Sequence, residues 1–228
     1  MTDAEAGEDA ESELARFTWH SYDLRSMLPE GWQQSILDVA EKFGRVILIH
    51  PTSITSREAS RDTEIPTYIV GNTAATQNLP WLYELYTGPI LKLAQVHSPD
   101  PVSLSNNPHR GLTIQVQRGQ EERYESHVDT VPLTGLLYVT DNPVGTGGEL
   151  VVSNRGEVWG VDEIEADASR IHPVAGNMIF FDARKYTHYV SPLKNSDALR
   201  AVVVMTFYTT ACPEDTRPAD LDNHLGLD

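Results

Sequence analysis

The C-terminal half of this chain consists of short β-like runs separated by turn residues, with no helical pattern between them. Such a series favours a closed or two-sheet β architecture over an α/β fold. The last run is apolar on both faces, which is typical of a strand buried between two layers. The runs cover residues 112–118, 123–129, 133–140, 149–153, 170–174, 178–182, 187–191 and 198–209.

The N-terminal half carries mainly helical patterns. Apolar residues recur at helical spacing over 32–43, and a second helical stretch covers about 78–94, with a kink expected at Gly88-Pro89. A β-branched run at 45–49 predicts one strand. We therefore expect a mostly β fold, a double-stranded β-helix (a jelly roll, cupin-like) with N-terminal supporting helices.

Two segments show no periodicity. Residues 51–66 are polar and form a long predicted loop, which suits either a lid or substrate loop or a mobile surface segment. Residues 1–14 are rich in Asp, Glu, Ala and Ser, which predicts a disordered acidic tail. The remainder, 15–228, is long enough for a single domain with a full core, and its jelly-roll part is expected at about 111–209.

Charge and cysteine content limit the classes of partner. The net charge of −16 argues against binding nucleic acid or an anionic membrane through a broad basic surface. The single cysteine, Cys212, allows no internal disulfide and fits a reducing compartment. No secretory signal or membrane-spanning run is present, so we expect a cytoplasmic location. The sequence sets no oligomeric state.

His127-Val128-Asp129, with a later His188, is the strongest candidate for a metal site. Residues two apart in a strand project to the same face, so His127 and Asp129 point the same way. In a jelly roll, a later strand returns beside an earlier one and can bring His188 to them. Two imidazoles and one carboxylate are the ligands of a non-haem Fe(II) facial triad.

Arg200, at the head of the last apolar strand, is a second clue. A buried guanidinium is costly unless an anion pairs with it, and the acid end of a 2-oxo acid cosubstrate is one such anion. Each residue also has a plain structural interpretation. An H-x-D triplet can occur by accident, His188 can be a satisfied core or surface histidine, and Arg200 can pair with Asp197.

Five segments together resemble the 2-oxoglutarate/Fe(II)-dependent oxygenase superfamily, in its prolyl-hydroxylase-like branch. The resemblance covers about residues 111–209. The segments are 124–129 (Y-x-x-H-x-D), 133–140 (a strand with a Tyr), 147–150 (G-G-x-L), 173–181 (P-x-x-G-x-x-x-F-F) and 188–202 (the distal His, V-x-P and an Arg-led strand).

This resemblance implies a cofactor set and site roles. His127, Asp129 and His188 would bind Fe(II), and Arg200 with Tyr138 would hold the distal carboxylate of 2-oxoglutarate. Tyr124 would line the cosubstrate pocket. O2 would be the second cosubstrate, and ascorbate a stimulant. The carboxylate of Asp129 argues against the family's halogenases, which lack it.

The expected function is a dioxygenase that hydroxylates a C–H bond of a small metabolite or free amino acid. The size of the chain and the lack of a basic groove or peptide-binding module favour a small-molecule partner. A protein or peptide hydroxylase of the prolyl type is the nearest alternative, and a non-catalytic metal-binding jelly roll is a third. The sequence leaves desaturation, epimerisation and ring formation open.

Overall fold

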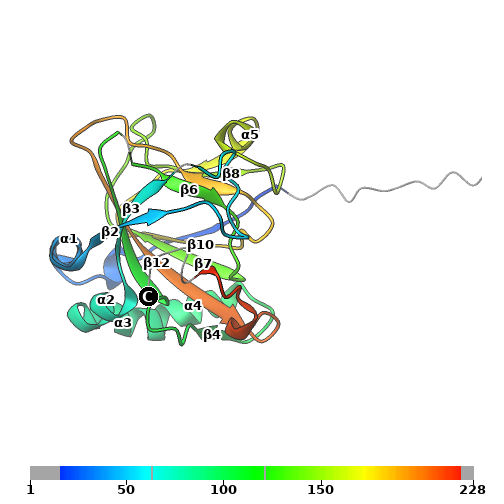
Figure 1. Cartoon of the computed structure of the whole chain (residues 1–228). Coiled ribbons are helices and arrows are strands. Elements are labelled where there is room, and N and C mark those ends of the chain that lie inside the picture. The colour runs from blue at the N-terminus through cyan, green and yellow to red at the C-terminus, as the bar shows by residue number, and fades with distance from the viewer. Residues whose placement is uncertain (1–15, 63, 121, 222–228) are drawn as a thin grey trace, which may run out of the picture.

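A computed structural model describes residues 16–62, 64–120 and 122–221. Two β-sheets face each other, and helices cover the outer face of the larger sheet (Figure 1). The predicted acidic tail at 1–14 lies outside the described residues. The mostly β fold class, a jelly roll with N-terminal supporting helices, is confirmed.

The larger sheet has eight strands, seven of them in the order β1-β10-β7-β12-β5-β3-β2, with β4 paired to β12. The smaller sheet has four strands in the order β6-β11-β8-β9. The strands of the larger sheet are β1 His20–Asp23, β2 Arg45–Ile49, β3 Ile65–Val70, β4 Val102–Leu104, β5 Leu112–Arg118, β7 Leu133–Tyr138, β10 Asn177–Phe181 and β12 Leu199–Thr209. Those of the smaller sheet are β6 Tyr124–His127, β8 Leu150–Ser153, β9 Ala168–Ile171 and β11 His188–Val190.

Most helical residues precede the jelly-roll strands in the chain. The helices are α1 Trp32–Phe43, α2 Asn72–Asn78, α3 Pro80–Leu85, α4 Leu91–Val96 and α5 Val161–Glu165, with 3-10 turns at Arg25–Met27 and Glu214–Thr216. A π-helical turn, Tyr86–Ile90, connects α3 to α4 and contains Pro89. This turn replaces the predicted kink, because the wider turn accommodates a residue without an N–H. No described helix combines the length and apolar character needed to cross a membrane.

The N-terminal half contributes more strands than the one predicted. β3 begins at the last two residues of the predicted polar loop, 65 and 66, where Pro66 argues against a strand, and continues to Val70. The structure tolerates Pro66 because β3 pairs with β5 through Tyr68 to Val70, beyond the proline. β1 and β4 are short and largely exposed or half-buried, so they carry little apolar signal.

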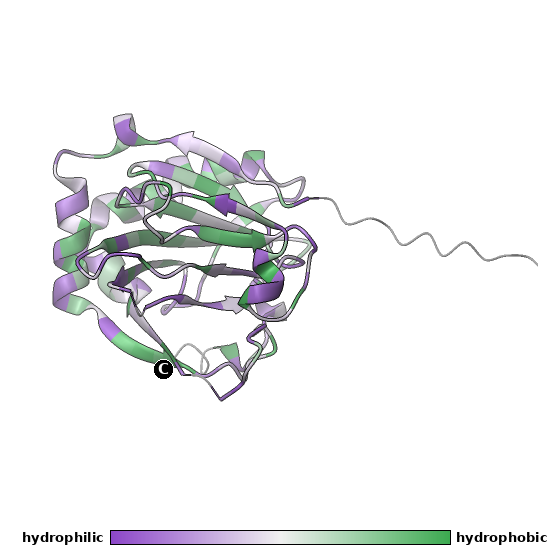
Figure 2. Cartoon of the chain, turned by 90° about the horizontal axis from the view of Figure 1, so that it is seen from above, coloured by the Kyte–Doolittle hydropathy of each residue, from purple (hydrophilic) through white to green (hydrophobic). Residues whose placement is uncertain are grey.

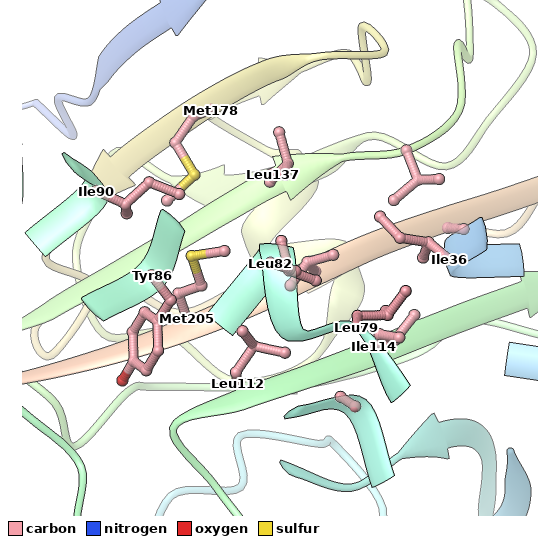
Figure 3. Packing of buried hydrophobic residues seen from close by; sticks show 14 of the residues in the cluster. Ile36, Leu79, Leu82, Tyr86, Ile90, Leu112, Ile114, Leu137, Met178 and Met205 are labelled. Atoms are coloured by element: carbon pink, nitrogen blue, oxygen red, sulfur yellow. The ribbon is translucent and has the colours of Figure 1, made fainter. Parts of the chain in front are cut away.

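β12 is buried on both faces, as predicted, and it separates two cores. Ala201, Val203 and Met205 face the helices, where they join a cluster with Leu82 and Tyr86. Figure 3 shows the labelled side chains of helices and sheet directed toward one another. In Figure 2 the hydrophobic colour is concentrated on the strands.

The opposite face of β12 points into the space between the two sheets. Val202 belongs to the inter-sheet cluster, and Arg200 lies two residues earlier on the same face. The alternation of β12 therefore positions one charged side chain inside the jelly roll.

Candidate metal centre

His127 and His188 are direct partners on adjacent strands of the smaller sheet, β6 and β11. Their ring centroids are 4.2 Å apart. Nδ1 of His127 lies 2.8 Å from the carbonyl of Glu125, and Nδ1 of His188 lies 3.2 Å from that of Tyr186. With Nδ1–H donating a hydrogen bond to these carbonyls, Nε2 of each ring is the atom that can bind a metal.

Asp129 completes the group from just beyond the strand. The predicted strand over 123–129 is too long, since β6 ends at His127. The backbone N–H of Asp129 donates to the carbonyl of Ala183 at 3.3 Å, which fixes the residue after the strand ends. Its Oδ1 lies 3.5 Å from Nε2 of His127 and 3.7 Å from Nε2 of His188.

The three ligand atoms lie within 4.8 Å of one another, and no other group of His, Cys, Asp or Glu in the described ranges meets this criterion. Thr134 donates its hydroxyl to Oδ2 of Asp129 at 2.8 Å, leaving Oδ1 toward the imidazoles. His172 stays outside the group, with Nδ1 3.6 Å from Glu149.

The electrostatics of the group suit a cation. Burial raises the pKa of the Asp129 carboxyl, but the charges and hydrogen bonds of His188, His127 and Thr134 outweigh burial and bring it to about 2. Burial and the neighbouring His127 lower the pKa of His188 to about 4. Burial lowers the pKa of His127, but Asp129 reverses this and raises it. An ionised carboxylate and a neutral imidazole are the forms that bind a metal ion.

The donor set fits Fe(II). Two imidazole nitrogens and one carboxylate oxygen converge from one side, as in a facial triad that keeps coordination positions open. The group borders a cavity of about 160 Å³ between the sheets. A cosubstrate bound in that cavity would therefore lie directly beside the metal.

Arg200 is buried in the same cavity, with 2% of its surface exposed. Its Nε donates to the carbonyl of Gly148 at 2.8 Å. Within the described part of the chain no carboxylate forms an ion pair with Arg200, so the predicted alternative of pairing with Asp197 does not hold. Burial lowers the pKa of Arg200, which is the cost that a bound anion would offset.

Close contacts explain why both residues of the G-G turn are glycines. Gly148 has a φ of +79°, and a Cβ there would lie 3.1 Å from Cδ of Arg200. Gly147 has a φ of +85°, and its Cβ would lie 2.1 Å from the carbonyl oxygen of Pro192. Gly147 therefore allows the close approach of the backbone at Pro192, and Gly148 allows that of the Arg200 side chain.

The two tyrosines differ in position. Tyr138 packs in the inter-sheet cluster and does not line the cavity, but the guanidinium carbon of Arg200 is 5.7 Å from its ring centroid. Its hydroxyl is buried with no hydrogen-bond partner in the described ranges, and burial raises its pKa to about 12. Tyr124 lines the cavity, and its ring centroid is 5.3 Å from that of His127.

The predicted loop over 51–66 forms a wall beside the metal site. Arg57 N–H donates to the carbonyl of Ser126 at 2.7 Å, and Val128 N–H donates to the carbonyl of Thr55 at 3.0 Å. Thr55 also lines the cavity. Residues 53 and 55–58 are buried, so the alternative of a mobile surface segment does not hold for them.

Sequence reasoning missed several residues of the cavity. Thr134 was only a weak candidate for the cosubstrate pocket, on the same strand face as Tyr138, and its contact with Asp129 was not predicted. Arg110 and Leu221 were not placed at the site, although both line the cavity. Arg110 and Leu221 belong to no periodic pattern. A threonine on the strand after H-x-D was the one available signal for Thr134.

Comparisons with known proteins agree with this geometry. The family model described as "2OG-Fe(II) oxygenase superfamily" matches residues 113–209. No curated protein matches the chain in sequence.

Several solved structures share the fold. The α-ketoglutarate-dependent epimerase SnoN from nogalamycin biosynthesis is 18% identical, with a TM-score of 0.56 over 85% of this chain and 78% of that chain. A 2OG-Fe(II) oxygenase family protein from Burkholderia pseudomallei is 10% identical, with a TM-score of 0.58 over 83% and 84%. A Trichoplax adhaerens prolyl hydroxylase, in complex with a hypoxia-inducible-factor peptide, is 12% identical, with a TM-score of 0.58 over 88% and 87%.

The predicted resemblance is thus confirmed, and with it the cofactor set of the family, Fe(II) and 2-oxoglutarate. One further structure of SnoN contains Fe3+ and α-ketoglutarate. The matched segment holds His127, Asp129, His188 and Arg200 in a jelly roll of the expected topology. Residues 113–209 of the chain thus match the 2OG-Fe(II) oxygenase superfamily in sequence, and the chain shares the fold of a solved structure described as a 2OG-Fe(II) oxygenase.

Proposed function

We propose that this protein is an Fe(II)- and 2-oxoglutarate-dependent dioxygenase that hydroxylates a C–H bond of a small metabolite or free amino acid. One observation carries the proposal: His127, Asp129 and His188 border a cavity that is also lined by a buried arginine without an ion-pair partner in the described ranges. When bound, iron with 2-oxoglutarate and O2 supplies the oxidising chemistry, which yields succinate and CO2.

In this proposal each side chain has a defined task. Nε2 of His127, Nε2 of His188 and Oδ1 of Asp129 hold the metal on one side, which leaves the cavity side for the cosubstrate. Arg200 fixes the distal carboxylate, and the hydroxyl of Tyr138 donates a hydrogen bond to the same group. Tyr124 forms a wall of the pocket. The apolar inter-sheet residues exclude water.

The shape of the site favours a small substrate over a peptide. The cavity is about 160 Å³, which is below the roughly 300–1,000 Å³ of typical ligand pockets. Thr55 of the segment 53–58 and Leu221 of the C-terminal turn are part of its lining. A peptide backbone would need an open groove that reaches the metal.

Two measurements test the proposal. The first is succinate release by the purified protein with Fe(II), 2-oxoglutarate and O2, which we expect to stop when any of the three is omitted. The second is mass spectrometry of a metabolite panel and of a proline-containing peptide panel after incubation. A gain of one oxygen in a small molecule supports the proposal. Oxidation confined to peptides would favour the prolyl-type alternative, and no succinate in any condition would exclude catalysis.

A further inference from the structure

Arg200 borders two cavities. It lines the main cavity beside the metal ligands, and it also lines a second, smaller cavity of about 20 Å³, which the proposed function does not use. Gln115 and Tyr124 line both cavities, whereas Thr67 and Gln117 line the smaller one and not the main one. The small cavity therefore adjoins the end of the main cavity where the cosubstrate is proposed to bind.

Three strands of the larger sheet bring Thr67, Gln117 and Arg200 into one row. β12 pairs with β5 so that Arg200 lies opposite Gln117. β5 pairs with β3 so that Val116 lies opposite Tyr68, which puts Thr67 level with Gln117. The side chains of Thr67, Gln117 and Arg200 are buried and all line the small cavity. A row of polar groups thus crosses the inner face of the sheet at this cavity.

The hydroxyl of Thr67 has no hydrogen-bond partner in the described ranges, although the residue is only 6% exposed. Its neighbours two positions away on β3, Ile65 and Ile69, belong to an apolar cluster. A buried hydroxyl without a hydrogen bond costs free energy, and a valine would fill the same space without that cost. We therefore expect a partner for this hydroxyl in the cavity that Thr67 lines.

The guanidinium of Arg200 also has a donor to spare. Of the five N–H groups of an arginine, the one on Nε donates to the carbonyl of Gly148. A carboxylate accepts two more in bidentate geometry, and the oxygen of Tyr138, whose ring centroid lies 5.7 Å from the guanidinium carbon, can accept another. One N–H of this buried side chain then remains for a further acceptor.

Gln117 supplies an acceptor to the row. Its Nε2 donates to the carbonyl of Glu122 at 2.6 Å and to the carbonyl of Ser191 at 2.8 Å. Both N–H groups of the amide are thus engaged, which leaves Oε1 as an acceptor. A donor on Arg200, an acceptor on Gln117 and a hydroxyl on Thr67, which can donate or accept, are together the partners that a water molecule can use.

We infer that the small cavity holds one water molecule that joins Thr67 and Gln117 to Arg200, and that Thr67 thereby positions the arginine for the cosubstrate. The inference rests on the role of Arg200 in the proposed function and adds a positioning residue to the same site. A buried water needs roughly 10–15 Å³ and typically forms about three hydrogen bonds, which this cavity of about 20 Å³ and its three polar partners provide.

In this arrangement the water accepts a hydrogen bond from Arg200 and donates to Oε1 of Gln117 and to Oγ1 of Thr67. The guanidinium is then held by Gly148 at Nε and by the water on the side of the small cavity. Its remaining N–H groups are directed to the main cavity, where the distal carboxylate of 2-oxoglutarate is proposed to bind.

Binding of 2-oxoglutarate to the full-length, Fe(II)-loaded protein, measured by calorimetry without O2, tests the role of Thr67. Thr67→Val keeps the shape and removes the hydroxyl, so it should weaken 2-oxoglutarate binding by about twofold to tenfold. Thr67→Ser keeps the hydroxyl and should bind like the wild type. Fe(II) affinity should not change in either variant, because Thr67 does not line the cavity at the metal ligands. If Thr67→Val binds 2-oxoglutarate like the wild type, or if Thr67→Ser binds as weakly as Thr67→Val, the inference is wrong.

Tyr208→Phe is the matched control. It also removes a buried hydroxyl that has no partner in the described part of the chain, but Tyr208 lines neither of the two cavities. Its binding of 2-oxoglutarate should equal that of the wild type. A loss as large as that in Thr67→Val would mean that removal of any buried hydroxyl disturbs the site, and the inference would fail.

A crystal structure of the protein with Fe(II) and 2-oxoglutarate, determined without O2, tests the water directly. We expect one ordered water within hydrogen-bond distance of Oγ1 of Thr67 and of the Arg200 guanidinium, and we expect Thr67→Val to lack it. A dry cavity would overturn the inference. A carboxylate oxygen of 2-oxoglutarate at this position would also overturn it, because Thr67 would then bind the cosubstrate without a water.

Arg200→Gln separates this inference from the proposed function. If Arg200→Gln binds 2-oxoglutarate as tightly as the wild type, the proposed role of Arg200 is wrong, and the inference fails with it. If Arg200→Gln loses binding and Thr67→Val does not, the proposed function stands and the inference alone is refuted.

Discussion

At the scale of single residues, the three proposed metal ligands are oriented by groups that would not bind the metal themselves. Thr134 donates to Oδ2 of Asp129 at 2.8 Å and so sets which oxygen faces the imidazoles. The backbone carbonyls of Glu125 and Tyr186 accept hydrogen bonds from Nδ1 of His127 and His188, and so set which nitrogen of each ring faces Asp129. Partners of this kind orient metal ligands and tune their affinity.

Thr134→Val should weaken Fe(II) binding by about tenfold to a hundredfold, because valine keeps the shape and removes the donor. An Fe(II) titration of the purified variant measures this change. Thr67→Val is the matched control, since the hydroxyl of Thr67 is buried without a partner in the described ranges. An unchanged Fe(II) affinity in Thr134→Val would show that Asp129 is oriented by other contacts.

Tyr138→Phe should raise the KM for 2-oxoglutarate without lowering the melting temperature. The buried hydroxyl has no partner within the described chain, so its removal relieves a desolvation cost of about 1–3 kcal/mol. The same removal deletes the hydrogen bond proposed to the cosubstrate. Steady-state kinetics and thermal unfolding report the two effects separately, and an unchanged KM would remove Tyr138 from the cosubstrate site.

Some residues of the site can be predicted from the sequence, and others become visible only in the folded structure. His127, Asp129 and His188 are recognisable because metal ligation needs particular residue types at a particular spacing. Arg110 and Thr134 act through contacts between segments that are distant or paired across a sheet, and a single sequence does not encode those contacts as a pattern.

At the scale of elements, the segment 53–58 shows how polar residues become part of a buried wall. The carboxylate of Glu58 accepts hydrogen bonds from both Nη atoms of Arg123, at 2.6 and 2.7 Å, and from the N–H of Ser126 at 2.6 Å. Polar composition led to the prediction of a loop, and that prediction is right about the lack of regular structure between β2 and β3. The prediction missed the burial of Glu58 because its partners, Arg123 and Ser126, are distant from it in sequence.

Glu58→Gln should lower stability by about 2–3 kcal/mol at neutral pH, since it weakens charged hydrogen bonds. Burial raises the pKa of Glu58, but Arg123 and Ser126 outweigh burial and lower it. The folded pKa is thus below the unfolded value of about 4.3, so the stabilisation is present above that pH and is lost as pH falls through the folded pKa.

Thermal unfolding across pH checks this prediction. The difference in melting temperature between the wild type and Glu58→Gln should be full near pH 7 and shrink below about pH 4. Glu41→Gln, at an exposed position of α1, should show no such difference. A gap that stays constant down to acid pH would mean that Glu58 stabilises the wall through packing and not through charge.

The strands illustrate which elements a sequence can predict. The run Arg45–Ile49 is predicted with the bounds that β2 has, because its β-branched residues lie between clear turn signals. β3 was missed because Pro66 and its polar surroundings hide a strand that tertiary pairing stabilises.

At the scale of the whole molecule, the larger sheet contributes residues to two hydrophobic clusters, one on each of its faces. The helices pack on its outer face through the cluster that includes Leu82 and Met205, and the inner face carries Arg200 and the cavity. The alternation of apolar residues predicts a buried strand, but it does not say which face carries the site. That choice depends on the pairing of β12 with β5 and β7, which is non-local.

Leu82→Ala should destabilise the protein by about 2–5 kcal/mol, because it leaves a cavity at a fully buried position between helix and sheet. Fe(II) affinity of the folded protein should not change, since the site lies on the other face. Chemical denaturation and an Fe(II) titration measure the two effects. Tyr83→Ala, 46% exposed on the same helix, is the control and should cost far less. A small effect of Leu82→Ala would mean that the helical layer is dispensable to the core.

In the proposed function, His127, Asp129 and His188 jointly hold the iron on which 2-oxoglutarate turnover depends. The most direct test measures bound Fe(II) and succinate release in Asp129→Ala, with Asp38→Ala on the exposed side of α1 as control. We predict that Asp129→Ala stays folded, loses tight Fe(II) binding and releases no succinate, whereas Asp38→Ala matches the wild type. Succinate release by Asp129→Ala at the wild-type rate would contradict the assignment of the metal centre.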